Sequence, residues 1–352
     1  MRRHIVPPYL LARLARAHDT GLDRAVVAAR RALAELPPLH EERRRSTLVA
    51  PRRGPETATG AGPRRTIADA RGTERLPGTV VRREGDPATG DVAVDEAYEG
   101  LGATHAFLLD AFGRASIDGE SLPLDATVHY GDDYDNAFWD GSRMVFGDGD
   151  GEVFGRFTAS LSVIGHELAH GVTQFTSGLV YQGQAGALNE SFSDVIGAMV
   201  EQHALGQTSS EASWLIGEGL FTPAVEGRAL RSMLAPGTAY DDDVLGRDPQ
   251  PADMAHYVET ADDNGGVHLN SGIPNRAFAL AAVELGGPSW ETAGAVWYDT
   301  ATRGGLPATA GFDDFAAATV RAAAARFGSG SAVERAVRGS WEKVGVGVDE
   351  RS

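Results

Sequence analysis

The chain has no cysteine among its 352 residues. This absence excludes disulfides, thiolate metal sites, cysteine nucleophiles and iron–sulfur clusters. Any tightly bound metal ion must therefore be held by His, Asp or Glu side chains. Long apolar runs are also missing, since none approaches the roughly 18 consecutive apolar residues of a membrane helix. The hydrophobic fraction of 42% and the charged fraction of 23% are typical of a globular protein, here long enough for two domains and an extra segment.

Positive charge is scarce and unevenly distributed. The formal net charge is −17, but residues 1–65 hold 14 arginines and 6 acidic residues, which gives them +8. Residues 66–352 therefore carry −25. A basic arm can bind nucleic acid, but this acidic body would repel it. We expect the arm to dock on the body of its own chain, and we expect no nucleic-acid partner, no membrane partner and a monomer.

The first residues lack the pattern of a signal peptide. Pro7 and Pro8 interrupt the apolar stretch, Arg13 and Arg16 follow soon after, and no small-residue cleavage site is present. We therefore expect synthesis in the cytoplasm, with a leaderless route if the protein is secreted.

Helical and turn signals divide the chain into an arm, a β-rich part and a helical part. The Gly- and Pro-rich residues 50–65 are typical of an exposed linker. Before residue 158 we expect helices at 8–17, 22–35 and 93–112, and strands at 79–81 and 127–130. Helical periodicity dominates afterwards, with helices expected at 188–204, 272–285, 289–302, 312–327 and 331–343.

The motif that indicates chemistry is His166-Glu167-Leu168-Ala169-His170. On a helix, residues four apart lie on one face with about 5–6 Å between their Cβ atoms, so His166 and His170 can hold one metal ion. Glu167 is close enough to act as a general base on a water molecule. The pattern is typical of a hydrolytic zinc site.

A catalytic zinc ion needs a third protein ligand and an open position. Thr173 and Thr176 occupy the positions where a metzincin has Gly and His, so that class is excluded. Glu190 lies at the start of the next helical pattern. If that helix packs back against the first one, Glu190 can reach the metal ion held by the two histidines. Asp194 is one turn further on, where it can accept the second ring N–H of His166. The alternative interpretation is that both acids only offset the helix dipole.

Four further segments complete a pattern that runs from about Arg65 to the C-terminus. They are Asn136-Ala137-Phe138-Trp139, Gly178-Leu179-Val180-Tyr181-Gln182, Arg231-Ser232-Met233 and Asp263-Asn264-Gly265-Gly266-Val267-His268-Leu269-Asn270-Ser271-Gly272. With them, the sequence resembles the thermolysin family of neutral zinc metallopeptidases, the gluzincins. Residues 5–11 resemble the short leaderless prosegment of the protealysin-like subgroup. The resemblance implies an α+β two-lobe fold: a prosegment and linker at 1–60, a β-rich lobe at 61–182, and an α-helical lobe at 183–352, with the zinc helix between the lobes.

The resemblance also implies a role for each matching residue. The zinc site would consist of His166, His170 and Glu190, with Glu167 as general base on a zinc-activated water and Asp194 behind His166. Tyr181 and His268 would hydrogen-bond the developing oxyanion, and Asp263 would orient His268. Substrate would be bound by Asn136, Ala137 and Arg231, and by the pocket residues Phe154, Val163 and Leu230. Because these pocket residues are apolar, cleavage before a bulky hydrophobic residue is implied. Without the resemblance, His268 is more simply a turn residue and Tyr181 a packing residue.

The positions of the family's calcium ligands depart from its pattern. They hold Ser162, Ser213 and Leu215 in place of acids, keep Glu201 and Glu218, and have Arg228 in place of the acid of a second site. Each lost carboxylate removes a hard oxygen ligand, which argues against tight calcium binding but leaves a weaker site open. Residues 147–152 resemble the start of an EF-hand loop, but the twelfth position is Ala159, so we interpret them as a turn.

We therefore predict a zinc-dependent endopeptidase made as a self-processed zymogen, whose residues 1 to about 60 cover the active site. One alternative is a catalytically inactive relative that binds peptides or a partner protein, although every catalytic position is filled. A zinc exopeptidase is another, but the segments at Asn136 and Arg231 favour an open cleft. For the arm, the alternative interpretation is a disordered tail. Low hydrophobicity supports this interpretation only between residues 40 and 65.

Overall fold

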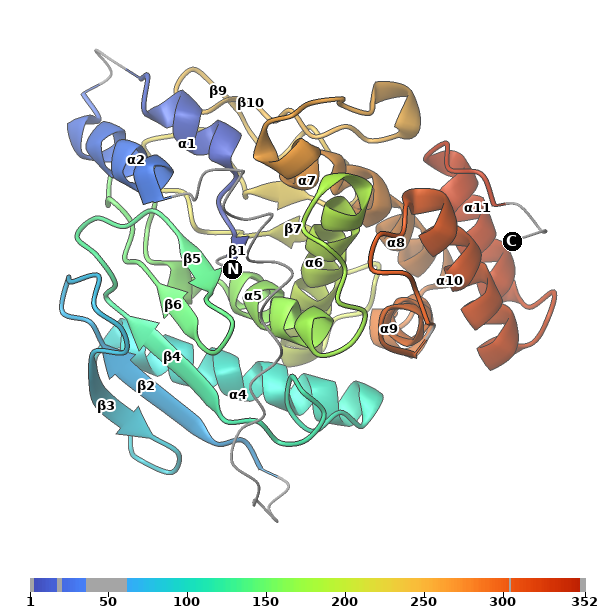
Figure 1. Ribbon diagram of the computed structural model, residues 1–352, viewed down its shortest axis with the longest axis horizontal. Helices are drawn as coiled ribbons and strands as arrows, with labels where there is room; N and C mark the ends of the chain where they lie inside the picture. The colour runs from blue at the N-terminus through green and yellow to red at the C-terminus, as the bar shows by residue number, and fades with distance from the viewer. Residues whose placement is uncertain (1–2, 18–20, 36–61, 304, 349–352) are drawn as a thin grey trace.

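The computed structural model describes residues 3–17, 21–35, 62–303 and 305–348. It has a β-rich lobe and a helical lobe, with helices α5 (Leu161–Gln174) and α6 (Gly183–Leu205) between them (Figure 1). The α+β two-lobe fold predicted from the sequence is thus confirmed. Most of the expected linker at residues 50–65, and of the segment of low hydrophobicity, lies outside the described residues.

A six-stranded sheet forms the β-rich lobe, in the order β1-β5-β6-β4-β2-β3. The strands are β1 (Arg3–His4), β2 (Arg65–Asp69), β3 (Thr79–Arg83), β4 (Leu124–Val128), β5 (Ala137–Trp139) and β6 (Met144–Phe146). Helix α4 (Val92–Phe112) packs on β2 and β4; Asp91 caps its start and the left-handed Gly113 ends it. The strand expected at 127–130 ends at Val128, because His129 turns away with a φ of 53°.

The helical lobe agrees closely with the periodicity of the sequence. Its helices are α7 (Asp263–Asn270), α8 (Gly272–Leu285), α9 (Ala293–Arg303), α10 (Phe312–Phe327) and α11 (Ala332–Lys343). Two expectations need correction: α6 begins at Gly183 rather than 188, and the helix expected at 289–302 is a short 3-10 turn followed by α9. Within the described part of the chain, no helix combines the length and apolar character needed to cross a membrane.

Two glycines let α5 and α6 pack directly against each other. A Cβ atom on Gly165 would lie 3.0 Å from the Cα of Gly197, and one on Gly197 would lie 2.3 Å from the carbonyl oxygen of Ser162. Such distances leave no room for a side chain, so the close approach depends on glycine at both positions. This contact brings Glu190 on α6 next to the two histidines on α5.

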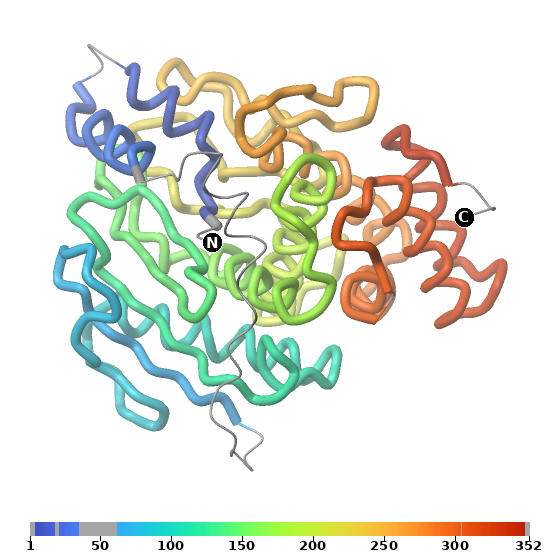
Figure 2. The backbone as a smooth tube through the Cα atoms, viewed as in Figure 1, coloured from blue at the N-terminus to red at the C-terminus, as the bar shows by residue number. Residues whose placement is uncertain are grey.

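The N-terminal arm packs on strand β5 and helix α5 of this body. After β1 it forms α1 (Pro8–Leu14) and α2 (Asp23–Glu35), which lie above β5 and beside β9 (Asp241–Asp242) and β10 (Gly246–Arg247) (Figure 1). Figure 2 shows the first described residues of the arm in the middle of the molecule, between the two lobes. Five apolar side chains at the start of the arm are fully buried: Ile5, Val6, Leu10, Leu11 and Leu14. The disordered-tail alternative therefore does not hold for residues 3–17 and 21–35.

Candidate metal centre and cleft

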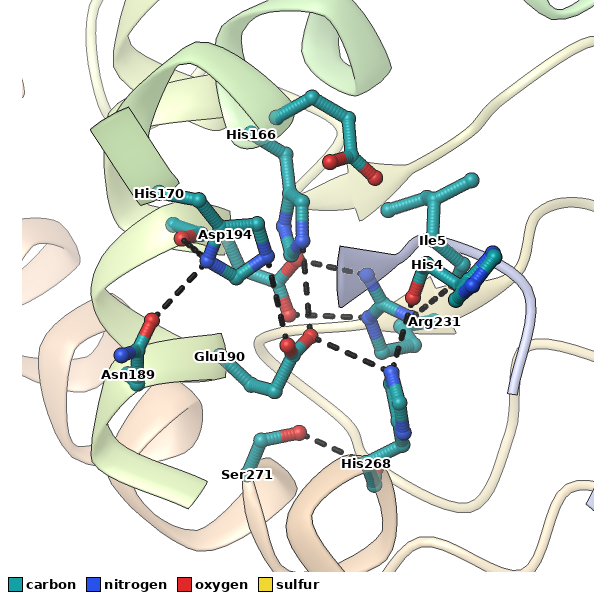
Figure 3. Close-up of polar contacts among 12 residues, drawn as sticks. His4, Ile5, His166, His170, Asn189, Glu190, Asp194, Arg231, His268 and Ser271 are labelled. Atoms are coloured by element: carbon teal, nitrogen blue, oxygen red, sulfur yellow. Dashed lines mark hydrogen bonds and ion pairs between the residues drawn. The ribbon is translucent and has the colours of Figure 1, made fainter. Parts of the chain in front are cut away.

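His166, His170 and Glu190 meet at one buried point, as the sequence predicts (Figure 3). Nε2 of His166 lies 3.4 Å from Oε2 of Glu190, and Nε2 of His170 lies 3.4 Å from Oε1 of the same carboxylate. Ligands about 2.0–2.1 Å from a tetrahedral zinc ion are separated by about 3.3–3.4 Å. The two imidazole nitrogens and the carboxylate therefore fit a zinc ion in kind and in spacing.

Hydrogen bonds behind the histidines fix which nitrogen faces the centre. Nδ1 of His166 lies 2.7 Å from Oδ1 of Asp194, the partner expected from its place on the helix. Nδ1 of His170 lies 2.9 Å from Oδ1 of Asn189, which in turn donates from Nδ2 to the carbonyl of Leu179. Both rings thus present Nε2 to the metal position. Sequence reasoning assigned no role to Asn189, which directly precedes Glu190; the hydrogen bond to His170 becomes visible only when α6 packs on α5.

The surroundings of the centre shift the pKa values of its two glutamates in opposite directions. Burial opposes ionisation of Glu190, but His268, His170 and His166 hold the pKa of its carboxyl well below the usual range. Glu167 is different, since burial raises its pKa to about 8. Its Oε2 accepts the N–H of Trp139 at 2.9 Å, which ties the proposed base to strand β5.

A left-handed turn places His268 opposite the histidine pair. Asp263, Asn264, Gly265 and Gly266 all have φ between 51° and 83°, a run that only Asn, Asp and Gly adopt readily. This turn lets Asp263 accept both the backbone N–H of His268 at 2.8 Å and its Nδ1–H at 2.6 Å. The Asp263-Asn264-Gly265-Gly266 segment is therefore needed for backbone geometry as well as for the carboxylate.

The second expected oxyanion donor lies beside the first. The hydroxyl of Tyr181 is 3.2 Å from Nε2 of His268 and donates a short hydrogen bond to Glu190. The structure thus brings together Tyr181, His268 and Asp263 beside the metal position. Their roles in stabilising an oxyanion remain predictions.

The arm's backbone lies between strand β5 on one side and His268 and Arg231 on the other, a space that we call the cleft. It contacts the residues that are expected to bind substrate. His4 pairs with Phe138 across β1 and β5. Nε2 of His268 donates to the His4 carbonyl at 2.9 Å, and Nη1 of Arg231 donates to the Ile5 carbonyl at 3.1 Å. Figure 3 shows these two donors converging on the arm from separate elements.

The edge residues Asn136 and Ala137 hold the next part of the arm. The N–H of Ile5 donates to the carbonyl of Ala137 at 3.2 Å, and the N–H of Val6 donates to Oδ1 of Asn136 at 3.0 Å. The apolar residues expected to line the adjoining pocket are fully buried in the same core cluster as Ile5: Phe154, Val163 and Leu230. Their role as pocket walls also remains a prediction.

This fold and site define a metallopeptidase with a two-histidine, one-glutamate centre. The family description "Thermolysin metallopeptidase, catalytic domain" matches residues 59–174, and "Thermolysin metallopeptidase, alpha-helical domain" matches residues 177–346. The chain therefore belongs to the thermolysin family of zinc-dependent metallopeptidases and is a metalloendopeptidase.

Individual relatives agree with this assignment. An extracellular metalloprotease of Pectobacterium carotovorum subsp. carotovorum is 52% identical over 98% of this chain and 96% of its own length. The structure of a protealysin precursor from Serratia proteamaculans matches with a TM-score of 0.88 and 50% identity, and covers 98% of this chain and all of that one. A thermolysin of Alicyclobacillus acidocaldarius subsp. acidocaldarius is 39% identical over 79% of this chain, which is half of its own length.

Proposed function

We propose that the protein is a zinc endopeptidase that is made as an inhibited precursor, removes its own arm and cleaves before bulky hydrophobic residues. The observation that carries this proposal is the path of the arm. Residues 4–6 make the backbone hydrogen bonds that an extended substrate would need, to His268, Arg231, Ala137 and Asn136. In this register the bond to be cut corresponds to the one between His4 and Ile5.

The side chains then have distinct tasks. When bound at His166, His170 and Glu190, zinc supplies a Lewis acid that polarises the substrate carbonyl and lowers the pKa of water. Glu167 accepts a proton from the attacking water and returns it to the leaving amine. His268 holds an N–H on the carbonyl oxygen as it gains charge.

The position of Ile5 supports the proposed specificity. Its carbonyl is bound by Arg231, its N–H by Ala137, and its side chain is fully buried. A substrate residue at this position would have to be apolar to enter the same surroundings without a desolvation cost.

The arm explains the proposed inhibition. A substrate cannot pair with β5 while β1 occupies that edge, so activity requires a cut within the arm or the linker up to about residue 60. The relatives named as an extracellular metalloprotease and as a precursor support export and processing of this chain as well.

The test combines metal content with casein hydrolysis, before and after nicking residues 40–65 of the full chain with an added protease. We expect about one zinc ion per chain, little activity before nicking, and activity afterwards that a zinc chelator abolishes. Glu167→Ala should keep zinc and lose activity. If the nicked chain binds zinc and cleaves nothing, the inactive-relative alternative takes the place of the proposal.

A further inference from the structure

Three acidic side chains stand at the mouth of the cleft where the arm leaves it. Asp132 and Asp133 lie just before strand β5, and Glu152 lies in the loop after β6. We call these three residues the acidic rim. Asp132 is exposed, and Asp133 and Glu152 are partly exposed. They therefore face the solvent around the cleft rather than the core.

The acidic rim already carries a cationic ligand, which belongs to the removable arm. Arg24 of α2 binds Asp133 with both prongs, Nη2 to Oδ1 at 2.5 Å and Nε to Oδ2 at 3.2 Å. Arg31 donates from Nη1 to the carbonyl of Asp132 at 2.6 Å. Glu152 accepts the N–H of Ala25 at 3.0 Å, at the positive end of the same helix.

The catalytic body does not neutralise the rim itself. Among residues 62–303 and 305–348, no arginine, lysine or histidine forms an ion pair with any of the three rim carboxylates. Two other acids of the β-rich lobe do have such partners: Asp148 pairs with His129 at 2.7 Å, and Glu96 pairs with Arg156 at 2.6 Å. Removal of the arm therefore leaves three like charges at one edge of the cleft.

The strand register brings a bound substrate toward this edge. Strands β1 and β5 are antiparallel, so residue numbers that rise along the arm face residue numbers that fall along β5: Arg3 faces Trp139, and His4 faces Phe138. Val6 reaches Asn136, and an extended peptide that continued in this direction would next pass residues 135 to 132. The arm avoids that path because it turns at Pro7 into helix α1. A substrate has no such constraint.

We propose that the processed enzyme selects substrates with a lysine or arginine at the third to fifth residue after the scissile bond, bound by the acidic rim. This inference rests on the proposed endopeptidase function. One exposed ion pair contributes little, but three acids of one sign at a cleft raise the local concentration of cations and speed their association. On the other side of the arm, Arg13 donates to the backbone carbonyls of Asp243 and Val244, and neither of these acceptors is a carboxylate.

The test uses the full chain after nicking of the linker, and three end-blocked peptides that differ only at the fourth residue after the cleaved bond. With Lys, Gln or Glu there, we expect kcat/KM to fall in that order, with about a 5-fold span at about 20 mM salt. The span should shrink toward equal cleavage at about 0.5 M salt, because solvent-exposed charges are screened.

Variants then locate the preference. The measured quantity is the ratio of kcat/KM for the Lys peptide to that for the Glu peptide. The triple variant Asp132→Asn, Asp133→Asn, Glu152→Gln should bring this ratio to about one, and Asp133→Lys should lower it below one. Glu284→Gln, an exposed acid on α8 paired with Lys343, should leave the ratio as it is. Equal cleavage of all three peptides by the unaltered enzyme, or a ratio that survives in the triple variant, would overturn the rim proposal.

The two proposals fail in different ways. If no peptide is cut although zinc is bound, the endopeptidase function itself is wrong. If all three peptides are cut at the same rate, only the rim proposal is wrong. If the triple variant does not fold, the unaltered enzyme still tests the rim proposal: a preference for the Lys peptide that does not shrink as salt is added would overturn it.

Discussion

Arg231 and Asp194 form a fully buried, two-pronged ion pair. Nε of Arg231 donates to Oδ2 at 2.9 Å, and Nη2 donates to Oδ1 at 2.8 Å. The same Oδ1 lies 2.7 Å from Nδ1 of His166, and Oδ2 accepts a hydrogen bond from Asn275 at 2.8 Å. One carboxylate thus orients both a metal-binding histidine and the arginine that holds the Ile5 carbonyl.

Asp194→Asn should therefore weaken the metal site and the fold together. Loss of the partner behind a metal-binding histidine lowers zinc affinity by about 10–100-fold. Breaking a buried ion pair from one side costs about 3–5 kcal/mol, because the charge of Arg231 is left uncompensated. Competition with a zinc chelator and urea unfolding measure the two effects.

The double variant Asp194→Asn, Arg231→Met separates the effect on zinc affinity from the effect on the free energy of unfolding. Removal of the second charge should restore part of the free energy of unfolding while zinc affinity stays low. Unchanged zinc affinity in Asp194→Asn would contradict the positioning role.

Ile5→Glu should activate the full chain without nicking. Ile5 is fully buried in the cleft, so a carboxylate there loses its hydration and the arm binds less well. We expect casein hydrolysis by the intact chain to rise by about 10-fold or more, since a buried unpaired charge costs several kcal/mol.

Val27→Glu is the matched control for this change, because Val27 lies on the same arm but is 58% exposed. It should leave the intact chain inhibited. Electrophoresis of the sample after the assay must show that Ile5→Glu is active before its arm is cut. If that variant remains silent until it is nicked, the cleft contacts of residues 4–6 are not what inhibits the enzyme.

The sequence predicted the elements with strong local signals and missed those that depend on distant partners. Helices such as α8 and α10 follow from apolar periodicity, and the zinc ligands follow from a five-residue motif and a resemblance. Strand β1 has two residues, too few for an alternating pattern, and it exists only because β5 offers an edge more than 130 residues away. The Arg231–Asp194 pair was missed for the same reason: each residue had a separate expected role, and only folding joins them.

His268→Ala should reduce kcat by about 10²–10³-fold, as expected for a lost donor to a developing oxyanion. Zinc content should not change, because His268 is outside the group of three ligands. Burial lowers the pKa of His268, but Asp263 and Glu190 outweigh it and raise the pKa to about 9, so the ring donates from both nitrogens at neutral pH. Asp263→Asn removes the larger of these two contributions and leaves that of Glu190, so we expect this variant to lose part of the activity and retain part. A His268→Ala enzyme with normal kcat would exclude this residue from the chemistry.

Glu201→Gln should stabilise the protein at alkaline pH, because burial disfavours the ionised form of the Glu201 carboxyl. Burial, with a contribution from Glu218, raises the pKa of Glu201 from its ordinary value of 4.5 to about 7. The folded chain then holds this proton more tightly than the unfolded chain. The contribution of Glu201 to stability is therefore fully present below pH 4.5, is lost as pH rises toward 7, and stays lost above it.

Thermal unfolding should accordingly show a Tm gain of about 2 °C for Glu201→Gln at about pH 8, and a smaller gain at about pH 5. Glu218→Gln should give part of the same gain, since it removes only the neighbouring charge. Calcium provides the opposing test, because a cation held between the two carboxylates would stabilise the unaltered chain instead. If calcium raises the Tm of the unaltered chain more than the substitution does, the pair is a working calcium site and this prediction is wrong.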